Sequence, residues 1–472
     1  MTLFCIEEVS FHERDVHLRL PFRFGVATLT SCPQVHVLVK VKFADGKVVE
    51  GCSAEMMVPK WFDKNTALSN EDNFEQLRTA LRVTRSAYLS DKKNKTAWQH
   101  FIDHYDAILG ACHAQNINAL TASYGPALID RAVIDAVCHH AGVSFYQCIQ
   151  ANMIGMKPGQ HHKLADVKEI NFDQFLSALS PSNTIAARHT VGLIDPLVKQ
   201  DITPDMPRDG LPVCLADVVQ YYGHTHYKLK LSGDANLDID RLEKINTVIK
   251  DSAKVITLDG NEQYTSGDQL NQFFEKFKAS SKLKSLSQKT IFVEQPIRRD
   301  QTMNTPIHDI AKVIPLLIDE SDSDLNTFVQ ATQLGYTGIS SKSCKGVYKS
   351  VINAARCAML SQKTGISFFQ SGEDLTMQAG VAVQQDLVLV SLLGLSHVER
   401  NGHHYVNGMA AVSQEEQLQF QKTYPSVYES QNDVVRLHIQ QGQIDLRSLN
   451  VQGFATGHER AQIDWHSMNR IY

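Results

Sequence analysis

Five short apolar runs in the middle of the chain each carry charged residues at or near their C-terminal end. In order, they are 227–231 (YKLKL), 256–264 (ITLDGNEQY), 291–296 (IFVEQP), 316–321 (LLIDES) and 339–346 (ISSKSCKG). Runs rich in Val, Ile, Leu and Phe predict buried parallel strands, and each interval leaves room for one crossover helix. The C-terminal ends of such strands meet at the mouth of a β/α barrel. We therefore expect these acids and lysines to converge on one site.

Three of the acids have the chemistry of a metal site. Asp259, Glu294 and Asp319 stand at the ends of the third, fourth and fifth predicted barrel strands. Carboxylate oxygens, with substrate oxygens and water, complete the octahedral shell that Mg²⁺ prefers. Such an ion would bind a substrate carboxylate and stabilise an enolate as negative charge develops. The sequence therefore predicts Mg²⁺ as cofactor, shared by these three carboxylates.

Two lysines have the positions of acid/base residues. Lys230 ends the second predicted barrel strand, Lys342 ends the sixth, and Lys228 precedes Lys230 on the same face. A nearby cation and burial both disfavour the charged form of lysine, so we expect the lysine pKa to fall toward that of a useful base. Lysines facing each other across the mouth suit proton removal on one side of a carbon and delivery on the other.

Taken together, these motifs resemble the enolase superfamily, and within it the muconate-lactonizing-enzyme subgroup. The resemblance covers the chain from the N-terminus to about Gly408. It implies that Lys230 and Lys342 are acid/base residues supported by Lys228, and that the first acid of the Asp319–Glu320 pair is the metal ligand. The matching residues are Lys228, Lys230, Asp259, Asn261, Glu294, Gln295, Pro296, Asp319, Glu320, Lys342 and Lys345.

The resemblance implies an α/β fold: a modified TIM-type (β/α)7β barrel with an α+β capping domain. We place the cap at 1–125 and the barrel at 126–409, with the segment 410–472 packing back on the cap. The cap shows a hairpin signal between 35–43 and 48–54, then helical patterns. The other predicted elements are helices at 69–90, 95–114 and 126–141, an insertion at 146–183, barrel strands at 184–194, 366–374 and 395–402, and a late hairpin turning at Gly442.

In this family two cap loops close over the barrel mouth, and by position they are 21–33 and 54–65 here. From the first loop we take Arg23 as a substrate-binding residue. Aromatic and methionine side chains on these loops either contact substrate or pack on the barrel rim, and the sequence leaves both alternatives open. They are Phe24, Met56, Met57 and Trp61.

The last two barrel strands depart from well-known relatives. Mandelate-racemase-like members use a histidine at the end of strand seven, whereas this chain has Glu373 there and Asp374 after it, which disfavours that chemistry. Dipeptide epimerases often carry D-x-D on strand eight to hold a substrate ammonium, and the matching positions here are Glu399 and Asn401. We take Asn261, Glu373, Glu399 and Asn401 as substrate-binding residues.

The predicted reaction begins with Mg²⁺-assisted removal of the proton α to a substrate carboxylate. Two opposed lysines favour a racemase or epimerase. Cycloisomerization and acid-sugar-type dehydration remain as alternatives on the same site, because they need one lysine as base. An alternative of another class is an enolase-fold binding protein without turnover.

The composition agrees with a cytoplasmic enzyme that acts on a small-molecule carboxylate. The 472 residues are 21% charged with a net charge of −5, which gives no reason to expect nucleic acid or membrane as partner. Nine scattered cysteines, with no C-x-x-C, indicate reduced thiols. The pairs His139–His140, His161–His162 and His403–His404 lack a second pair at convincing spacing, so we do not expect them to bind metal. The family also leaves a homo-oligomer open.

Overall fold

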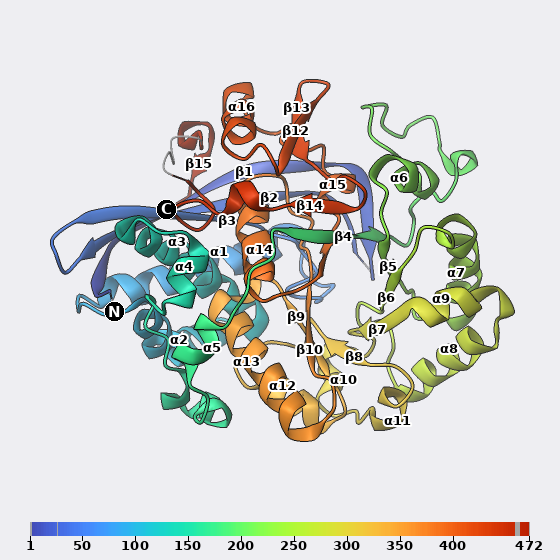
Figure 1. Cartoon of the computed structure of the whole chain (residues 1–472), viewed down its shortest axis with the longest axis horizontal. Coiled ribbons are helices and arrows are strands. Elements are labelled where there is room, and N and C mark those ends of the chain that lie inside the picture. Colours follow the sequence, from blue (N-terminus) through green and yellow to red (C-terminus); the bar gives the residue numbers. More distant parts are fainter. Residues whose placement is uncertain (1, 26, 458–462, 472) are drawn as a thin grey trace.

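The computed structural model describes residues 2–25, 27–457 and 463–471, and its N-terminal part is built on an antiparallel sheet (Figure 1). The strands are β1 (Phe4–Phe24), β2 (Ala27–Phe43), β3 (Val48–Met56) and the short edge strand β15 (Asn469–Arg470), in the order β15-β1-β2-β3. Alternation along β2 buries Val37, Val39 and Val41, while Lys40 and Lys42 reach the surface. The hairpin predicted around residues 44–47 is confirmed by the β2–β3 register.

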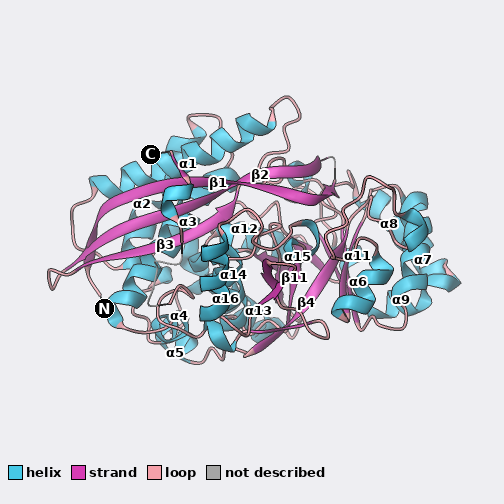
Figure 2. Cartoon of the chain, turned by 90° about the horizontal axis from the view of Figure 1, so that it is seen from above, coloured by secondary structure: helices cyan, strands magenta, loops and turns pink. Residues whose placement is uncertain are grey.

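Three helices cover one face of this sheet (Figure 2). They are α1 (Asn70–Ser90), α2 (Ala97–His113) and α3 (Ala119–Ala141). Ser69 and Thr96 begin α1 and α2 with reciprocal capping boxes, and Gly142 ends α3 in the left-handed conformation at φ 69°. The three predicted helices are confirmed, although α3 begins earlier than expected because Asn118 caps it and Pro126 lies inside it.

The C-terminal part is a closed barrel of eight parallel strands, as predicted. β11 pairs with β4 to close it, and each pair of consecutive strands is joined through helix, which gives the (β/α)7β arrangement. The strands are β4 (Thr184–Val191), β5 (His226–Lys230), β6 (Val255–Asp259), β7 (Thr290–Glu294), β8 (Leu316–Ile318), β9 (Gly338–Ser341), β10 (Phe369–Gly372) and β11 (His397–Arg400).

Helices surround the barrel, with α7, α8 and α9 on one side in Figure 1 and α13 and α14 on the side of the cap. The connecting helices are α6 (Leu215–Tyr222), α7 (Ala235–Ile249), α8 (Gly267–Ala279), α9 (Lys284–Lys289), α10 (Arg299–Thr302), α11 (His308–Ala311), α12 (Thr327–Gln333), α13 (Val347–Thr364) and α14 (Val381–Leu392). The described 3-10 turns are Pro158–Gln160, His162–Val167, Lys199–Asp201, Ser281–Leu283, Ser343–Lys345, Arg447–Leu449 and Trp465–Ser467. No helix in the described ranges is long and apolar enough to cross a membrane.

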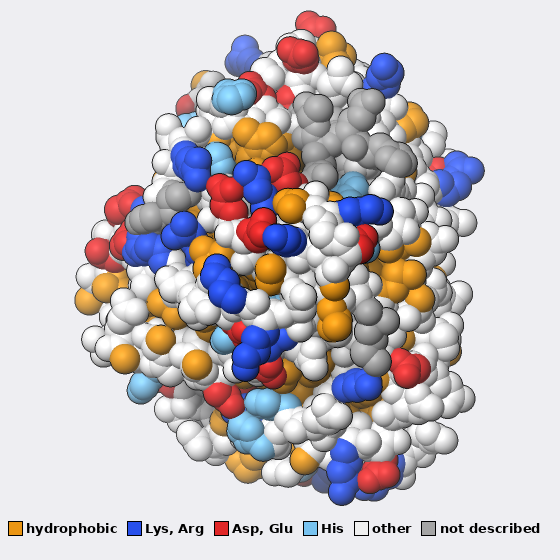
Figure 3. All heavy atoms as spheres, turned by 90° about the vertical axis from the view of Figure 1, so that its left-hand side faces the viewer, with side chains coloured by type: hydrophobic (Ala, Val, Ile, Leu, Met, Phe, Trp, Pro, Cys, Tyr) orange, Lys and Arg blue, Asp and Glu red, His pale blue; other side chains and the backbone are white. Residues whose placement is uncertain are grey.

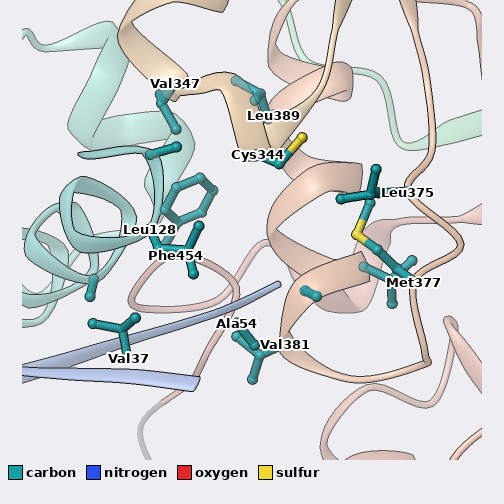
Figure 4. Close-up of a cluster of buried hydrophobic side chains, with 14 of the residues drawn as sticks. Val37, Ala54, Leu128, Cys344, Val347, Leu375, Met377, Val381, Leu389 and Phe454 are labelled. Carbon is teal, nitrogen blue, oxygen red and sulfur yellow. The ribbon is translucent and has the colours of Figure 1, made fainter. Parts of the chain in front are cut away.

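Cap and barrel share one hydrophobic core (Figure 4). Val37 and Ala54 from the cap sheet and Leu128 from α3 belong to the same cluster as Val347 of α13 and Leu389 of α14. The predicted insertion packs at this side too, as α4 (Phe145–Gln150) and α5 (Phe172–Ser177). On the outer face of this part of the molecule, basic and acidic side chains are intermixed (Figure 3).

The C-terminal segment contacts both parts of the molecule. Its elements are α15 (Gly402–Tyr405), α16 (Gln414–Thr423), β12 (Tyr428–Gln431), β13 (Val434–Leu437), β14 (Gln443–Asp445) and β15. One hairpin is β12–β13, which turns at Asn432 and Asp433. The turn predicted at Gly442 is confirmed, because Gln440 and Gln443 pair antiparallel on either side of it, but the strand that follows does not return to the cap. β14 instead pairs with β4 of the barrel, while β15 pairs with β1 of the cap. The domain division at residue 125 stays a proposal, because α3 runs through it.

The close approach of β3 to α3 gives a prediction about stability. A Cβ atom on Gly51 would lie 2.1 Å from the carbonyl oxygen of Ala132 in α3, so Gly51→Ala forces strand and helix apart. We expect a loss of about 1–3 kcal/mol of unfolding free energy, measured by urea denaturation. The control is Gly110→Ala in α2, where an added Cβ atom would meet no described atom within 4 Å apart from the backbone of its own helix. It should gain about 0.5–1 kcal/mol, and equal stabilities for the two variants would contradict the packing argument.

Candidate active site

The strand alternation of β5 directs two lysines into the barrel. Tyr227 and Leu229 pack in the apolar layer between strands and helices, so Lys228 and Lys230 point to the barrel interior. Both lysine side chains are buried. The pattern of YKLKL therefore places two ammonium groups among the acids at the ends of the neighbouring strands.

The Lys228 ammonium group lies at the centre of four carboxylates. Its Nζ is 3.0 Å from Asp259 Oδ2, 2.7 Å from Glu294 Oε2, 2.8 Å from Glu373 Oε2 and 2.9 Å from Glu399 Oε2. These acids come from the ends of β6, β7, β10 and β11. Burial alone would lower the pKa of Lys228, but the four carboxylates outweigh it and raise that pKa well above its ordinary value.

Glu294 is the least satisfied of these acids. It contacts Lys228, yet neither of its carboxylate oxygens receives a well-directed hydrogen bond from the described residues. Burial raises the pKa of Glu294 well above its ordinary value, and the charges of Asp259 and Glu373 add to the effect. A buried carboxylate in this position favours a further positive charge beside it.

Lys230 and Lys342 lie on opposite sides of the barrel mouth. β5 and β9 are separated by β6, β7 and β8 in one direction and by β10, β11 and β4 in the other. Lys230 Nζ is 2.6 Å from Asp259 Oδ2, and Lys342 Nζ is 2.7 Å from Asp319 Oδ2. Burial would lower the pKa of Lys342, but Asp319 raises it above its ordinary value. The expected fall in the lysine pKa rests on a nearby metal cation, and Asp319 by itself has the opposite effect on Lys342.

Asp319 is held by the next strand and by the preceding one. Besides Lys342, Lys345 Nζ lies 3.3 Å from its Oδ1, and Ser340 donates a hydrogen bond to the same oxygen. The backbone of Asp319 donates to Gln295 Oε1 at 2.8 Å, so the glutamine of the E-Q-P motif fixes the end of β8. The adjacent Glu320 points elsewhere and accepts a hydrogen bond from Asn261 Nδ2 at 3.1 Å.

The three expected metal ligands are near one another but do not converge on a single point. Asp259 and Glu294 both contact Lys228, whereas Asp319 is turned toward Lys342. Among the described residues, the groups of three acidic, histidine or cysteine ligands whose atoms lie within 4.8 Å of one another occur elsewhere. The three carboxylates point in different directions for an electrostatic reason, because each of them pairs with a lysine ammonium group. The donor set still fits Mg²⁺ chemically: it consists of buried carboxylates, and Glu294 lacks a hydrogen-bond donor.

A cavity of about 20 Å³ lies between the lysines and the cap. Aromatic side chains cover both proton-carrier candidates: Lys342 Nζ is 4.2 Å from the ring centre of Trp61, and Lys230 Nζ is 5.7 Å from that of Phe22. This volume accommodates about one water molecule, so a substrate enters only if the covering residues move. The cavity is lined by Phe22, Phe24, Val58, Trp61, Lys228, Lys230, Asn261, Lys342, Asp374, Leu375, Thr376, Glu399 and Asn401.

Arg23 is not among the residues that the structure brings together. Segment 21–33 forms the end of the β1–β2 hairpin rather than an open loop, with Phe22 paired to Leu29. Strand alternation turns Phe22 and Phe24 inward and leaves the Arg23 side chain exposed, which corrects the predicted substrate contact. Met56 and Met57 are buried in the shared core, so for them the packing alternative holds.

The substrate-binding candidates on the last two strands face the interior but already have partners. Glu373 pairs with Arg188 and Lys228. Glu399 accepts from Thr190 Oγ1 at 2.6 Å and contacts Lys228. Sequence reasoning missed Arg188 and Thr190, although their alternate positions in TIAARHTV are a signal that they share the inner face. Asn401 lines the cavity, and its Oδ1 has no hydrogen-bond partner within the described chain.

Ion pairs tie the cap segment 54–65 to the barrel. Arg299 donates to the carbonyl oxygens of Trp61 at 2.7 Å and Phe62 at 2.8 Å, and it pairs with Glu262. Lys64 also pairs with Glu262, at 2.5 Å. A groove of about 760 Å³ runs beside these contacts and reaches Glu320 at the strand ends. The residues that hold segment 54–65 against the barrel therefore border this groove.

The Lys228 contacts generate a prediction about charge balance. Lys228→Met leaves its four buried carboxylates without their shared cation, so we expect a loss of about 3–5 kcal/mol of unfolding free energy. Mg²⁺ should restore part of this loss, because a divalent cation replaces the missing charge. Urea denaturation with and without Mg²⁺ measures both effects. The control is Lys92→Met on the exposed surface, and equal losses for the two variants would refute the assignment.

No family model and no curated protein matches this sequence, but solved structures match its fold. 2-Chloromuconate cycloisomerase from Rhodococcus opacus 1CP is 15% identical, with a TM-score of 0.58 over 97% of this chain and 98% of that one. An enolase from Bradyrhizobium, complexed with magnesium and mandelic acid, is 12% identical, with a TM-score of 0.58 over 98% of both chains. A dipeptide epimerase from Enterococcus faecalis V583, complexed with Mg and L-Leu-L-Tyr, is 15% identical, with a TM-score of 0.53 over 84% and 90%.

The similar structures include muconate cycloisomerases, mandelate racemase/muconate-lactonizing-like proteins and dipeptide epimerases. They agree with the closed parallel barrel and the antiparallel cap sheet described above. Since the sequence identities are low, the comparison establishes architecture alone. The chain therefore has the fold of the enolase superfamily.

Proposed function

We propose that this protein is an enolase-superfamily isomerase that uses Mg²⁺ and removes the proton α to a substrate carboxylate. The observation that carries the proposal is the placement of Lys230 and Lys342 on opposite sides of one buried cavity surrounded by acids. In this arrangement the two amines approach opposite faces of a carbon atom held between them. A racemase or epimerase requires that geometry, because proton removal and return occur on different faces.

Asp259, Glu294 and Asp319 are the residues that would hold Mg²⁺. When bound, the ion supplies positive charge to the substrate carboxylate and so stabilises the negative charge that forms as the α-proton leaves. The proposal is supported by their buried carboxylate chemistry and by similar folds solved with magnesium. Any cation on these acids competes with the lysines for the same negative charge, so it would bring the lysine pKa down toward the value of a base.

The lysines carry the protons, and the aromatic side chains over them, called the cover here, shield them from water. One lysine takes the α-proton as a free amine, and the opposite lysine gives a proton as an ammonium ion. Trp61 and Phe22 lie over these amines and exclude water, which strengthens the electrostatic interactions beneath them. Lys228 remains positively charged and keeps the inner carboxylates from repelling one another.

The contacts of Glu399 bear on the substrate. Because Lys228 and Thr190 already satisfy this carboxylate, it is a weaker ammonium site than the sequence suggested. Asn401 Oδ1 instead offers an acceptor inside the cavity, and Phe22 and Trp61 offer apolar surface. We infer that the substrate is a small carboxylate with an apolar group and a hydrogen-bond donor.

We also infer a cytoplasmic location.

Cycloisomerization is the second candidate, and the match to 2-chloromuconate cycloisomerase favours it. That chemistry needs one lysine as base, whereas racemization needs both lysines as proton carriers. Acid-sugar-type dehydration also needs one base. A non-catalytic enolase-fold protein would keep the barrel but show no proton exchange.

The two-base mechanism predicts the behaviour of the lysine variants. Lys230→Ala and Lys342→Ala should each abolish racemization, while one of them still exchanges the α-proton of a single enantiomer with solvent. The measurement is proton NMR in D₂O with Mg²⁺ and a library of acid sugars, N-acyl amino acids and dipeptides. Lys92→Ala serves as the exposed control. Full turnover by both active-site variants would rule out the mechanism, and one indispensable lysine would favour cycloisomerization or dehydration.

The ion pairs of the cover predict a second kinetic effect. Arg299→Ala removes the donor to the carbonyl groups of Trp61 and Phe62, so the aromatic cover is positioned less well over the lysines. We expect kcat/KM to fall roughly 10- to 100-fold. Arg298→Ala is the matched control, because this exposed neighbour pairs with Asp300 outside the site. Equal kcat/KM for wild type and Arg299→Ala would show that these contacts do not position the cover.

A further inference from the structure

Three buried histidines meet outside the candidate active site. His189 lies on β4, where its inward-facing neighbours are Arg188 and Thr190. His224 precedes β5, and His403 lies in α15, just after β11. His403 Nε2 is 3.1 Å from His189 Nδ1 and 3.2 Å from His224 Nε2. The three ligand atoms lie within 4.8 Å of one another.

These distances match the edges of a metal coordination shell. Two nitrogen ligands of a tetrahedral ion at about 2.0–2.1 Å are separated by roughly 3.3–3.4 Å. The separations around His403 are close to that value. A hydrogen-bond network explains the cluster less well than metal binding does. His403 Nε2 carries at most one proton, which can point at only one of its two neighbouring nitrogens.

The protonation of the cluster also suits metal binding. His224 Nδ1 lies 3.0 Å from the carbonyl oxygen of Ala187, so it donates its proton there and leaves the Nε2 lone pair facing the cluster. Burial lowers the pKa of His224 to about 4 and that of His189 and His403 well below the ordinary value. The rings are therefore neutral at pH 7, which is the form that binds metal.

The positive charges around the cluster are compensated. Arg19 forms a bidentate pair with Asp209, at 2.6 and 2.9 Å. Arg400 pairs with Asp374 and Asp386. These guanidinium groups therefore repel a bound cation less, because carboxylates already neutralise their charge. His403 also lines a separate cavity of about 20 Å³, which has room for one water molecule.

We propose that His189, His224 and His403 form a binding site for a divalent transition-metal ion of the Zn²⁺ type, with water from the adjacent cavity as fourth ligand. The site would tie α15 to the first two barrel strands. Because α15 follows Glu399 and Asn401, the ion would hold the end of β11 in place beside the catalytic cavity. This inference is independent of the proposed reaction.

The proposal departs from the sequence expectation for one member of the pair His403–His404. Sequence reasoning looked for a second histidine pair, whereas His403 meets single histidines from two other segments. His404 is buried beside them, but its ring nitrogens do not join the group of ligand atoms found in the described chain.

Metal binding to the full chain tests the proposal. Chelator-treated protein is titrated with Co²⁺ in excess Mg²⁺, which occupies the active-site carboxylates. We expect one Co²⁺ per chain with the intense visible absorption of tetrahedral cobalt. X-ray absorption of the Zn²⁺-loaded wild type should show three imidazole nitrogens at about 2.0–2.1 Å. Failure of the wild type to bind either ion at micromolar concentration, or a shell without imidazoles, overturns the proposal.

Variants then assign the ligands. His403→Gln should lower Co²⁺ affinity roughly 100-fold, and His404→Gln, its buried neighbour, should leave it unchanged. Glu294→Gln should also retain this site, which separates it from the active-site acids. Circular dichroism checks the fold of each variant, and if His403→Gln does not fold, the wild-type absorption spectrum decides. Unchanged affinity in a folded His403→Gln protein contradicts the assignment.

Discussion

The ammonium group of Lys228 is the constraint on which the barrel interior depends. It stands within contact of acids from four strand ends, and those acids would repel one another without it. A lysine on β5 therefore links β6, β7, β10 and β11 through the barrel interior. The same charge sets the orientation of Asp259 and Glu294, and through them the space in which a substrate can lie.

Much of the fold and of this site follows from the sequence, because an apolar run that ends in a charged residue can be recognised without knowing the fold. The spacing of charged residues placed Lys228, Lys230, Asp259, Glu294, Asp319 and Lys342 at the ends of neighbouring strands, since parallel strands of a barrel end at one mouth. The hairpin 21–33 shows the limit. Treated as a loop, this segment gave Arg23 and Phe24; treated as a strand, its alternation gives Phe22 and Phe24 and excludes Arg23. Here the backbone pairing of Phe22 with Leu29 makes the segment a strand hairpin rather than a loop.

Other features depend on contacts that spacing does not encode. Asp319 was placed correctly at a strand end, but its turn toward Lys342 follows from side-chain pairing across β8 and β9. The meeting of His189, His224 and His403 joins residues far apart in the chain and on the outer side of the barrel. Alternation places Arg188 and Thr190 on one face of β4, but their contacts with Glu373 and Glu399 join different strands and follow only from the fold.

The core shared by cap and barrel restricts how this protein can open. Val37, Ala54 and Leu128 pack in one apolar cluster with α13 and α14, so swinging the whole cap away would expose that cluster to water (Figure 4). Phe22 and Trp61 belong to the same cluster but also line the cavity, so movement of these two short segments exposes less of the cluster than a swing of the whole cap. For the proposed reaction, access to the cavity therefore calls for movement of two short segments, whose sequence can change while most of the core beneath them stays intact.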